Sequence, residues 1–281
     1  MNEPKSDETP PPAQGSPLVG PREWPPSEMR WPPPPGSEEP SGAERPAPWT
    51  ALVLVVLIAL LVQIAGAVLL QAWTRVGEHA GELAELDGLA RLARVVELPG
   101  GLEVLVLGVQ LPLLAFALLL VSTLPGGPWH ALGLRAPDAR AWHWGVALLG
   151  TLVVQQTASR ALSAPFDPPE HLELLQQGLL QRPLWVGALL AVAAPALCEE
   201  LFFRGWLQRR LRVAWGGSLS VLLSGTIFAA YHWDPVHVLG VLPIGLWIAW
   251  WGERSRSTWL PIACHAANNA FALTLVHLGF E

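Results

Sequence analysis

The sequence predicts an all-α protein, a polytopic bundle of about seven membrane-spanning helices with short amphipathic helices at the interface. Three observations indicate this fold class. Hydrophobic residues make up 51% of the chain, charged residues only 14%, and long runs without charge recur along it. A soluble domain carries about 25% charged residues. The low charge therefore predicts a multi-pass protein of the cell membrane, surrounded by the lipid bilayer.

Charge and cysteine content narrow the functional classes. The net charge is −6 and the basic residues are mostly scattered singly, so nucleic-acid binding is not indicated. Cys198 and Cys264 are the only cysteines of the sequence, and both lie in apolar runs. They are therefore expected to be small buried residues, rather than a disulfide or a thiolate metal site. No cleaved signal peptide is expected, since a polar segment precedes the first apolar run.

Three regions are expected along the chain. Residues 1–49 hold 15 of the 28 prolines and almost no aliphatic residues, which predicts a disordered cytoplasmic tail that is also a candidate for binding a partner. Residues 50–182 are expected to form N-terminal transmembrane helices with amphipathic loops, and residues 183–281 a catalytic helical core. A cytoplasmic N-terminus would leave 12 of the 17 basic residues on the cytoplasmic side, and this bias favours that orientation.

Spanning helices are expected where apolar runs are long enough to cross a bilayer. Trp49 and Trp73 bracket the first run in the manner of interfacial anchors. Pro125 to Pro128 are expected to end the second helix, and Asp234-Pro235 to break the chain before the sixth, which is short at 16 residues. The expected ranges are 50–72, 104–124, 142–159, 183–212, 216–232, 236–251 and 258–278.

Two shorter amphipathic helices are expected along the membrane surface. Between Gly77 and Leu98 leucines recur every third residue among charged residues, which predicts one helix with a single apolar stripe. Asp167-Pro168-Pro169-Glu170 is expected to open the other, with Asp167 as the cap and Glu170 completing a capping-box pattern.

Glu199 and Glu200 are adjacent carboxylates at the end of an uncharged run that begins at Pro183. Charged side chains inside a bilayer are costly and are usually kept for function. Arg204 lies four residues after Glu200 and is its expected ion-pair partner on the same helix face. Glu199 is rotated by about 100° from Glu200 and is expected to be free for chemistry. The alternative is a cytoplasmic helix end with ordinary interfacial charges.

Two histidines follow on later apolar segments. His232 ends the fifth expected helix, while His265 and Asn269 lie four residues apart and project from one face of the seventh. Either histidine alone is compatible with an ordinary interface residue. For His232 to lie beside Glu199, the fifth helix has to tilt strongly, or the turn at 233–235 has to dip into the bundle.

The order of these residues resembles the motifs of the CAAX-processing and bacteriocin-processing (CPBP, or abortive-infection) family of intramembrane proteases. Each motif alone is weak, whereas all three in order on successive apolar segments are specific. The resemblance covers roughly residue 184 to the C-terminus. The motifs are Glu199-Glu200-x-x-x-Arg204, Phe228-x-x-x-His232 and His265-x-x-x-Asn269.

The resemblance implies an intramembrane endopeptidase that hydrolyses a peptide bond of a membrane-associated protein or peptide. In that reading Glu199 with His232 holds and deprotonates the attacking water, while His265 and Asn269 stabilise the oxyanion. The supporting residues are Glu200, Arg204 and Phe228.

A metal ion in the site is left open by the sequence. Glu199, His232 and His265 are candidate ligands of a divalent metal such as zinc, with one open position for water. The family is described both as metalloproteases and as metal-independent glutamate proteases. The chain has no His-Glu-x-x-His signature, so a metal-independent mechanism is the other possibility.

Two functions of other classes compete with the protease. A non-catalytic membrane scaffold or a peptide-toxin immunity protein would use the same helices without hydrolysis. A proton-coupled transporter would use the same glutamate and histidines as a relay, and inverted hydropathy repeats would favour it. The sequence shows no such repeats.

Overall fold

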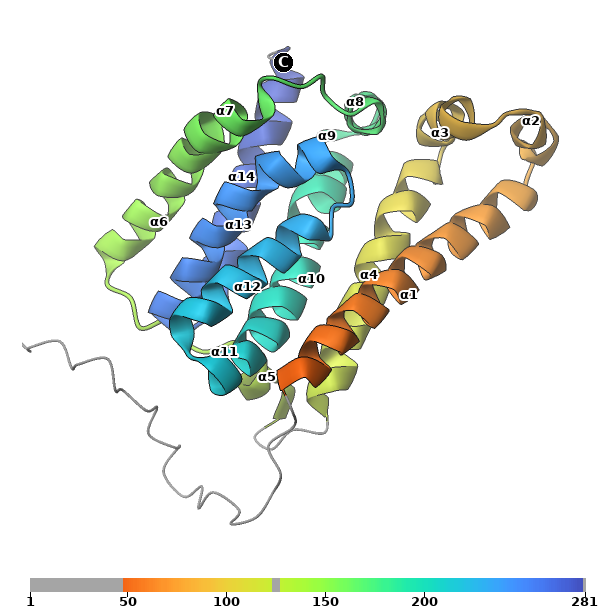
Figure 1. Ribbon diagram of the computed structural model, residues 1–281. Helices are drawn as coiled ribbons and strands as arrows, with labels where there is room; N and C mark the ends of the chain where they lie inside the picture. The colour runs from red at the N-terminus through yellow and green to blue at the C-terminus, as the bar shows by residue number, and fades with distance from the viewer. Residues whose placement is uncertain (1–47, 123–126, 280–281) are drawn as a thin grey trace, which may run out of the picture. The chain divides into compact units, whose positions relative to one another are not determined.

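The structure, a computed structural model, describes residues 48–122 and 127–279, and every regular element in this part of the chain is a helix (Figure 1). The all-α prediction is confirmed. Seven long helices lie within one or two turns of the expected ranges. They are α1 (Pro48–Arg75), α4 (Gly101–Ser122), α6 to α7 (Ala141–Val154 and Arg160–Ser163, joined by η1, Gln155–Ser159), α9 to α11, α12 (Gly217–Ala230), α13 (Pro235–Ser255) and α14 (Trp259–His277).

The fourth long helix runs without a break from Leu184 to Trp215 and carries the paired glutamates. Two stretches of it, η2 and η3, have the wider turns of a π-helix, which often occur at functional sites. Its parts are α9 (Leu184–Gly187), η2 (Ala188–Ala193), α10 (Ala194–Glu200), η3 (Leu201–Gln208) and α11 (Arg209–Trp215).

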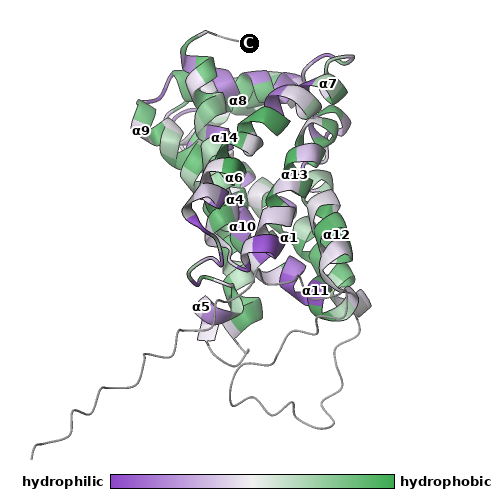
Figure 2. Ribbon diagram, turned by 90° about the vertical axis from the view of Figure 1, so that its left-hand side faces the viewer, coloured by the Kyte–Doolittle hydropathy of each residue, from purple (hydrophilic) through white to green (hydrophobic). Residues whose placement is uncertain are grey.

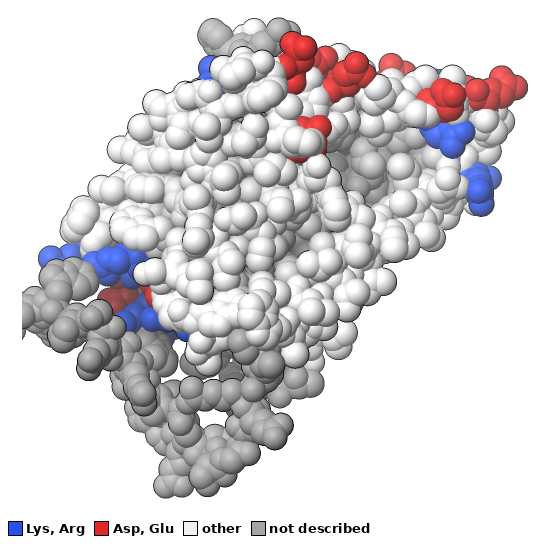
Figure 3. Space-filling model, in the orientation of Figure 1, with Lys and Arg blue, Asp and Glu red and all other residues white. Residues whose placement is uncertain are grey.

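Several helices have the character of membrane spans. By length and composition, four described helices qualify: 49–75, 101–122, 184–215 and 235–255. In Figure 2 hydrophilic residues gather near α5 (Gly127–Ala131) and α11 at one end and near α8 (Glu170–Leu180) at the other. Figure 3 shows charged side chains at the two ends of one face, with an almost uncharged band between them. The described helices thus form a polytopic bundle with an apolar belt.

Four local predictions are corrected or fall outside the described residues. The expected helix at 77–98 is two helices, α2 (Ala80–Glu85) and α3 (Gly88–Glu97), because Leu86 and Asp87 between them are extended. Helix α8 has Pro169 as its N-cap and no side-chain cap bond, so Asp167 does not cap it. The expected tail at 1–49 lies outside the described residues except for its last two, and Pro125 and Gly126 of the expected helix stop also lie outside them.

The sixth expected helix is also longer than predicted. Helix α13 has 21 residues, because Pro235 occupies its first turn and because the helix continues past the expected end at residue 251 to Ser255. The Asp234 side chain accepts a hydrogen bond from the backbone N–H of His237, at 2.9 Å, and thereby caps the helix. In Figure 1 the turn between α12 and α13 lies below the level of α8.

Helices α1 and α4 pack together and against the glutamate-bearing helix. Gly66 and Gly108 lie at their crossing, where the Gly66 Cα is 3.6 Å from an ideal Cβ position on Gly108. Small residues of this kind let membrane helices approach closely. One buried cluster then joins α1, α4, η3 and α12, and it includes Val62, Leu113, Phe203 and Phe228. This packing brings α4 beside Glu199.

Candidate active site

Glu200 is the centre of a buried ion-pair network. Its side chain is fully buried, and its Oε1 lies 3.1 Å from Nη1 of Arg204. The same oxygen lies 2.8 Å from Nδ1 of His265 on α14. The geometry agrees with the expected Glu200–Arg204 pair. It adds a second partner, because Glu200 also holds a histidine ring.

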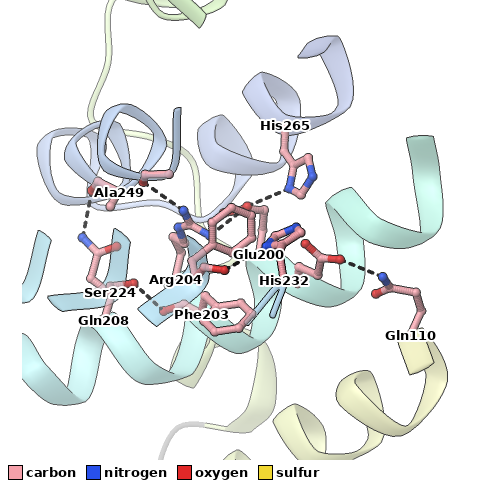
Figure 4. A network of polar contacts seen from close by, with 12 residues as sticks. Gln110, Glu200, Phe203, Arg204, Gln208, Ser224, His232, Ala249 and His265 are labelled. Carbon is pink, nitrogen blue, oxygen red and sulfur yellow. Dashed lines mark hydrogen bonds and ion pairs between the residues drawn. The ribbon is translucent and has the colours of Figure 1, made fainter. Parts of the chain in front are cut away.

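Arg204 joins the network to α13 and α12. Its Nη2 donates to the backbone oxygen of Gly245 at 3.0 Å, and its guanidinium carbon lies 4.1 Å from the centroid of the Phe228 ring. One turn further along, Gln208 Nε2 donates to the oxygen of Ala249 at 2.8 Å. Two buried polar side chains of η3 thus bind two carbonyl groups on the facing side of α13, and they fix the helices relative to each other (Figure 4).

Glu199 faces away from this ion pair, toward α4. Its Oε1 accepts a hydrogen bond from Nε2 of Gln110 at 2.7 Å. Both residues are buried, with 5% of Glu199 and 7% of Gln110 exposed. The second carboxylate oxygen, Oε2, is buried and has no hydrogen-bond partner among the described residues. The sequence analysis also assigned different roles to the two glutamates, with Glu200 paired to Arg204 and Glu199 free for chemistry. In the structure Oε2 of Glu199 is the oxygen available to react.

His232 lies in the turn that follows α12. Its Nδ1 is 3.1 Å from the backbone oxygen of Phe228. A carbonyl only accepts, so Nδ1 carries the proton and the neutral ring has its lone pair on Nε2. The next residue, Trp233, has a φ of 63°, which is uncommon for a bulky side chain and is found at functional sites.

The Phe228 ring brings the two predicted histidines together. Its centroid lies 5.3 Å from that of His232 and 5.8 Å from that of His265, and both pairs are edge-to-face. Figure 4 shows His232, Glu200 and His265 around Arg204 and near Gln110, which comes from a separate helix. Residues from α4, the fourth long helix, α12 and α14 therefore meet in one region.

Asn269 lies one turn beyond His265 and is partly engaged. Its Nδ2 donates to the backbone oxygen of Ala191 at 2.9 Å, and its Oδ1 accepts from Nδ2 of Asn268 at 3.1 Å. Ala191 belongs to the π-helical stretch η2. One N–H of the Asn269 amide remains for another acceptor. The bond to Ala191 thus links α14 to the fourth long helix.

Two residues of this region were not predicted, although the sequence carries a signal for each. Gln110 is the only polar residue between Glu103 and Ser122 in an apolar helix, and such residues are rare inside membranes. His237 is the only ionisable residue between Asp234 and Glu253, and its ring centroid lies 4.6 Å from that of His232. In each case the signal is a single polar residue, and no second polar residue at motif spacing accompanies it.

The predicted ligands of a divalent metal are Glu199, His232 and His265. Within residues 48–122 and 127–279, no three His, Cys, Asp or Glu side chains are grouped so as to hold a metal ion. The divalent metal stays a prediction.

Comparison with known families agrees with the resemblance. Residues 181–271 match the family model described as Rce1-like, type II CAAX prenyl endopeptidase. The matched segment contains all seven motif residues, whereas Gln110 lies outside it. No match was found among curated proteins or among solved structures. Over this segment the match agrees with the CPBP-type resemblance, and at the family level it supports a CAAX-type intramembrane protease.

Proposed function

From the Rce1-like character of residues 181–271, we propose that this chain is an intramembrane endopeptidase whose attacking water is activated by Glu199 and His232. The observation that carries the proposal is the unequal bonding of the Glu199 carboxylate. One oxygen is held by Gln110, and the other is buried without a partner in the described residues. A buried acceptor of this kind is costly unless a ligand or water donates to it.

The proposed reaction begins with water between Glu199 and His232. One water hydrogen is donated to Oε2 of Glu199 and the other to Nε2 of His232. As the water oxygen adds to the peptide carbonyl carbon, its first proton passes to Glu199, and the carbonyl π pair becomes an oxyanion. The C–N bond then breaks, and Glu199 returns that proton to the leaving nitrogen, so that an amine and a carboxylic acid are released.

His265 and the remaining N–H of Asn269 are the proposed oxyanion donors. In this role His265 is protonated on both nitrogens, with Nδ1–H directed to Glu200 and Nε2–H directed to the oxyanion. In that state Glu199 and Glu200 carry two negative charges, and Arg204 with His265 carries two positive ones. Buried charges are tolerated when they are paired in this way.

The proposed orientation of the helix bundle in the membrane rests on the distribution of arginines. In Figure 1 helix α1 begins at the same end of the bundle as α5 and α11. That end carries Arg209, Arg210 and Arg212 of α11, and the C-terminal end of α13 carries Arg254 and the C-cap residue Arg256. This distribution supports, by the positive-inside rule, a cytoplasmic location for the end at which α1 begins.

A cleavage assay on the full chain in lipid nanodiscs tests the proposal. A library of membrane-associated peptides is incubated with the wild type, Glu199→Gln, His232→Ala and the control Glu97→Gln, whose carboxylate is exposed. We expect kcat/KM to fall by about 100-fold or more in the first two variants and to stay unchanged in the control. Undiminished cleavage by both site variants would overturn the assignment. Loss of wild-type cleavage with a chelator, and recovery with zinc, would instead assign water activation to a metal.

A further inference from the structure

Gln110 is the one direct link between the N-terminal helices and the reacting carboxylate that the structure shows within residues 48–122 and 127–279. Its Nε2 is 2.7 Å from Oε1 of Glu199, although the two residues are 89 positions apart. It lies on α4, well before the segment that matches the protease family. The residue is therefore contributed by a part of the chain to which neither the motifs nor the family match assigns a role.

The bond determines which way the Gln110 amide faces. An ionised carboxylate only accepts hydrogen bonds, so the NH2 group must face Glu199 and the amide oxygen must face elsewhere. That oxygen, Oε1, is buried and has no partner in the described part of the chain. The same is true of Oε2 of Glu199. Gln110 and Glu199, which are neighbours in space, thus present two buried acceptors to which a bound molecule can donate hydrogen bonds.

The two acceptors suit different donors. In the proposed reaction the attacking water donates its hydrogens to Glu199 and His232, which leaves Gln110 Oε1 without a donor. A peptide substrate in an extended conformation supplies one, because its backbone N–H groups need acceptors when they leave water. Glutamine is suitable for this contact because its amide is neutral and adds no charge next to Glu199.

We infer that Gln110 is a positioning and substrate-binding residue: its Nε2 orients the Glu199 carboxylate, and its Oε1 accepts a hydrogen bond from a backbone N–H of the peptide substrate. The inference rests on the proposed protease function. It adds a residue outside the matched family segment and a specific contact to the substrate main chain.

The first experiment compares the kinetics of Gln110→Met with those of Gln208→Leu in nanodiscs. Gln208 is a matched control, since it is also a buried glutamine whose Nε2 donates at 2.8 Å to another helix. We expect Gln110→Met to lower kcat by about 10- to 100-fold and to raise KM. Gln110→Asn keeps the amide on a shorter side chain and is expected to recover part of kcat. The control is expected to lose thermal stability and to lose less kcat than Gln110→Met, which separates a role at Glu199 from a general loss of helix packing.

The second experiment tests the substrate contact. In a series of substrate peptides, each backbone N–H near the cleaved bond is replaced in turn by an ester oxygen. At one position the wild type is expected to lose about 10-fold in kcat/KM, and Gln110→Met is expected to show no further loss at that position. This coupling separates a direct contact from general damage to the fold.

The outcomes distinguish failure of this inference from failure of the proposed function. Loss of cleavage in Glu199→Gln with unchanged kcat in Gln110→Met would overturn the positioning role and leave the protease intact. An ester penalty that is equal in the wild type and in Gln110→Met at every position would overturn the substrate contact. Full cleavage by Glu199→Gln would overturn the proposed function itself.

Discussion

Nδ1 of His265 lies 2.8 Å from Oε1 of Glu200, although these residues are 65 positions apart in the chain. Glu200 also binds Arg204, so one carboxylate oxygen has two side-chain partners. From the sequence alone Glu200 was expected only as the partner of Arg204. Its contact with His265 means that it also sets the orientation of a ring that faces the candidate active site.

Replacing Glu200 is expected to destabilise the protein strongly. Glu200→Gln removes the counter-charge of Arg204, whose side chain is only 1% exposed. A buried charge left without its partner costs about 3–5 kcal/mol in free energy of unfolding. Reversible denaturant unfolding in detergent micelles measures the loss. Glu97→Gln, which breaks an exposed pair with Arg94, is the control and is expected to change stability little. Equal losses in the two variants would contradict the network's role.

Arg204 is not expected to be replaceable by lysine. The guanidinium donates through Nη1 to Glu200 and through Nη2 to Gly245 while it lies over Phe228, and a single ammonium group cannot reproduce all three contacts. Arg204→Lys is therefore expected to lower the free energy of unfolding by about 1.5–3 kcal/mol. Arg212→Lys serves as the comparison, because the ion pair of Arg212 with Glu253 is partly exposed and a lysine can also form an ion pair there. A smaller loss in Arg204→Lys than in Arg212→Lys would show that the fork geometry is unimportant.

The fold was predictable because membrane-spanning helices are long apolar segments that can be recognised in the sequence. Uncharged runs identified the seven long helices, since a spanning segment must be apolar along its whole length. Local errors arose where single side chains decided the outcome. Leu86 looked like one more leucine of a helical stripe and is extended, and Asp234 looked like part of a break and is the cap of α13.

The candidate site was predictable only where residues repeat at helical spacing. Glu200 and Arg204 were paired correctly because four residues place side chains on one helix face. Contacts between helices follow from packing instead. Gln110 and His237 stand alone in apolar helices, so nothing in their spacing indicates Glu199 or His232 as neighbours.

The interfacial helices α2 and α3 are expected to loosen at low pH. A hydrogen bond from Arg94 holds the pKa of the Glu82 carboxyl below its ordinary value of 4.5. The folded form thus prefers ionised Glu82, and its contribution is present above that ordinary value and lost as the pH falls through the lowered one. Hydrogen exchange of residues 80–97, corrected for the intrinsic pH effect, is expected to speed up over this range.

Two variants isolate that effect. Glu82→Gln removes the titrating group and is expected to abolish its part of the pH dependence, with exchange fast at neutral pH as well. Glu85→Gln on the same helix is expected to keep the wild-type dependence. An unchanged profile in Glu82→Gln would mean that another group controls the opening of α2 and α3.

The close contact between α12 and α13 is expected to tolerate no added methyl group. A Cβ on Gly225 would lie 3.0 Å from the backbone nitrogen and Cα of Leu246, atoms that cannot rotate away. Gly225→Ala should push α13 outward and lengthen the bond from Arg204 to Gly245, the residue that precedes Leu246. Such overpacking costs about 1–3 kcal/mol. We therefore expect both a lower melting temperature and a lower kcat.

Gly145 provides the matched control, because a Cβ added there meets nothing within 4 Å. Gly145→Ala in α6 is expected to be neutral or to stabilise the protein by about 0.5–1 kcal/mol, since alanine is the better helix former. Calorimetry and the cleavage assay on the two variants compare the same chemical change in a crowded and an open position. If Gly225→Ala were as stable and as active as Gly145→Ala, the spacing of α12 and α13 would not determine where Arg204 and Phe228 lie. The dependence of the ion-pair network on that spacing would then be wrong.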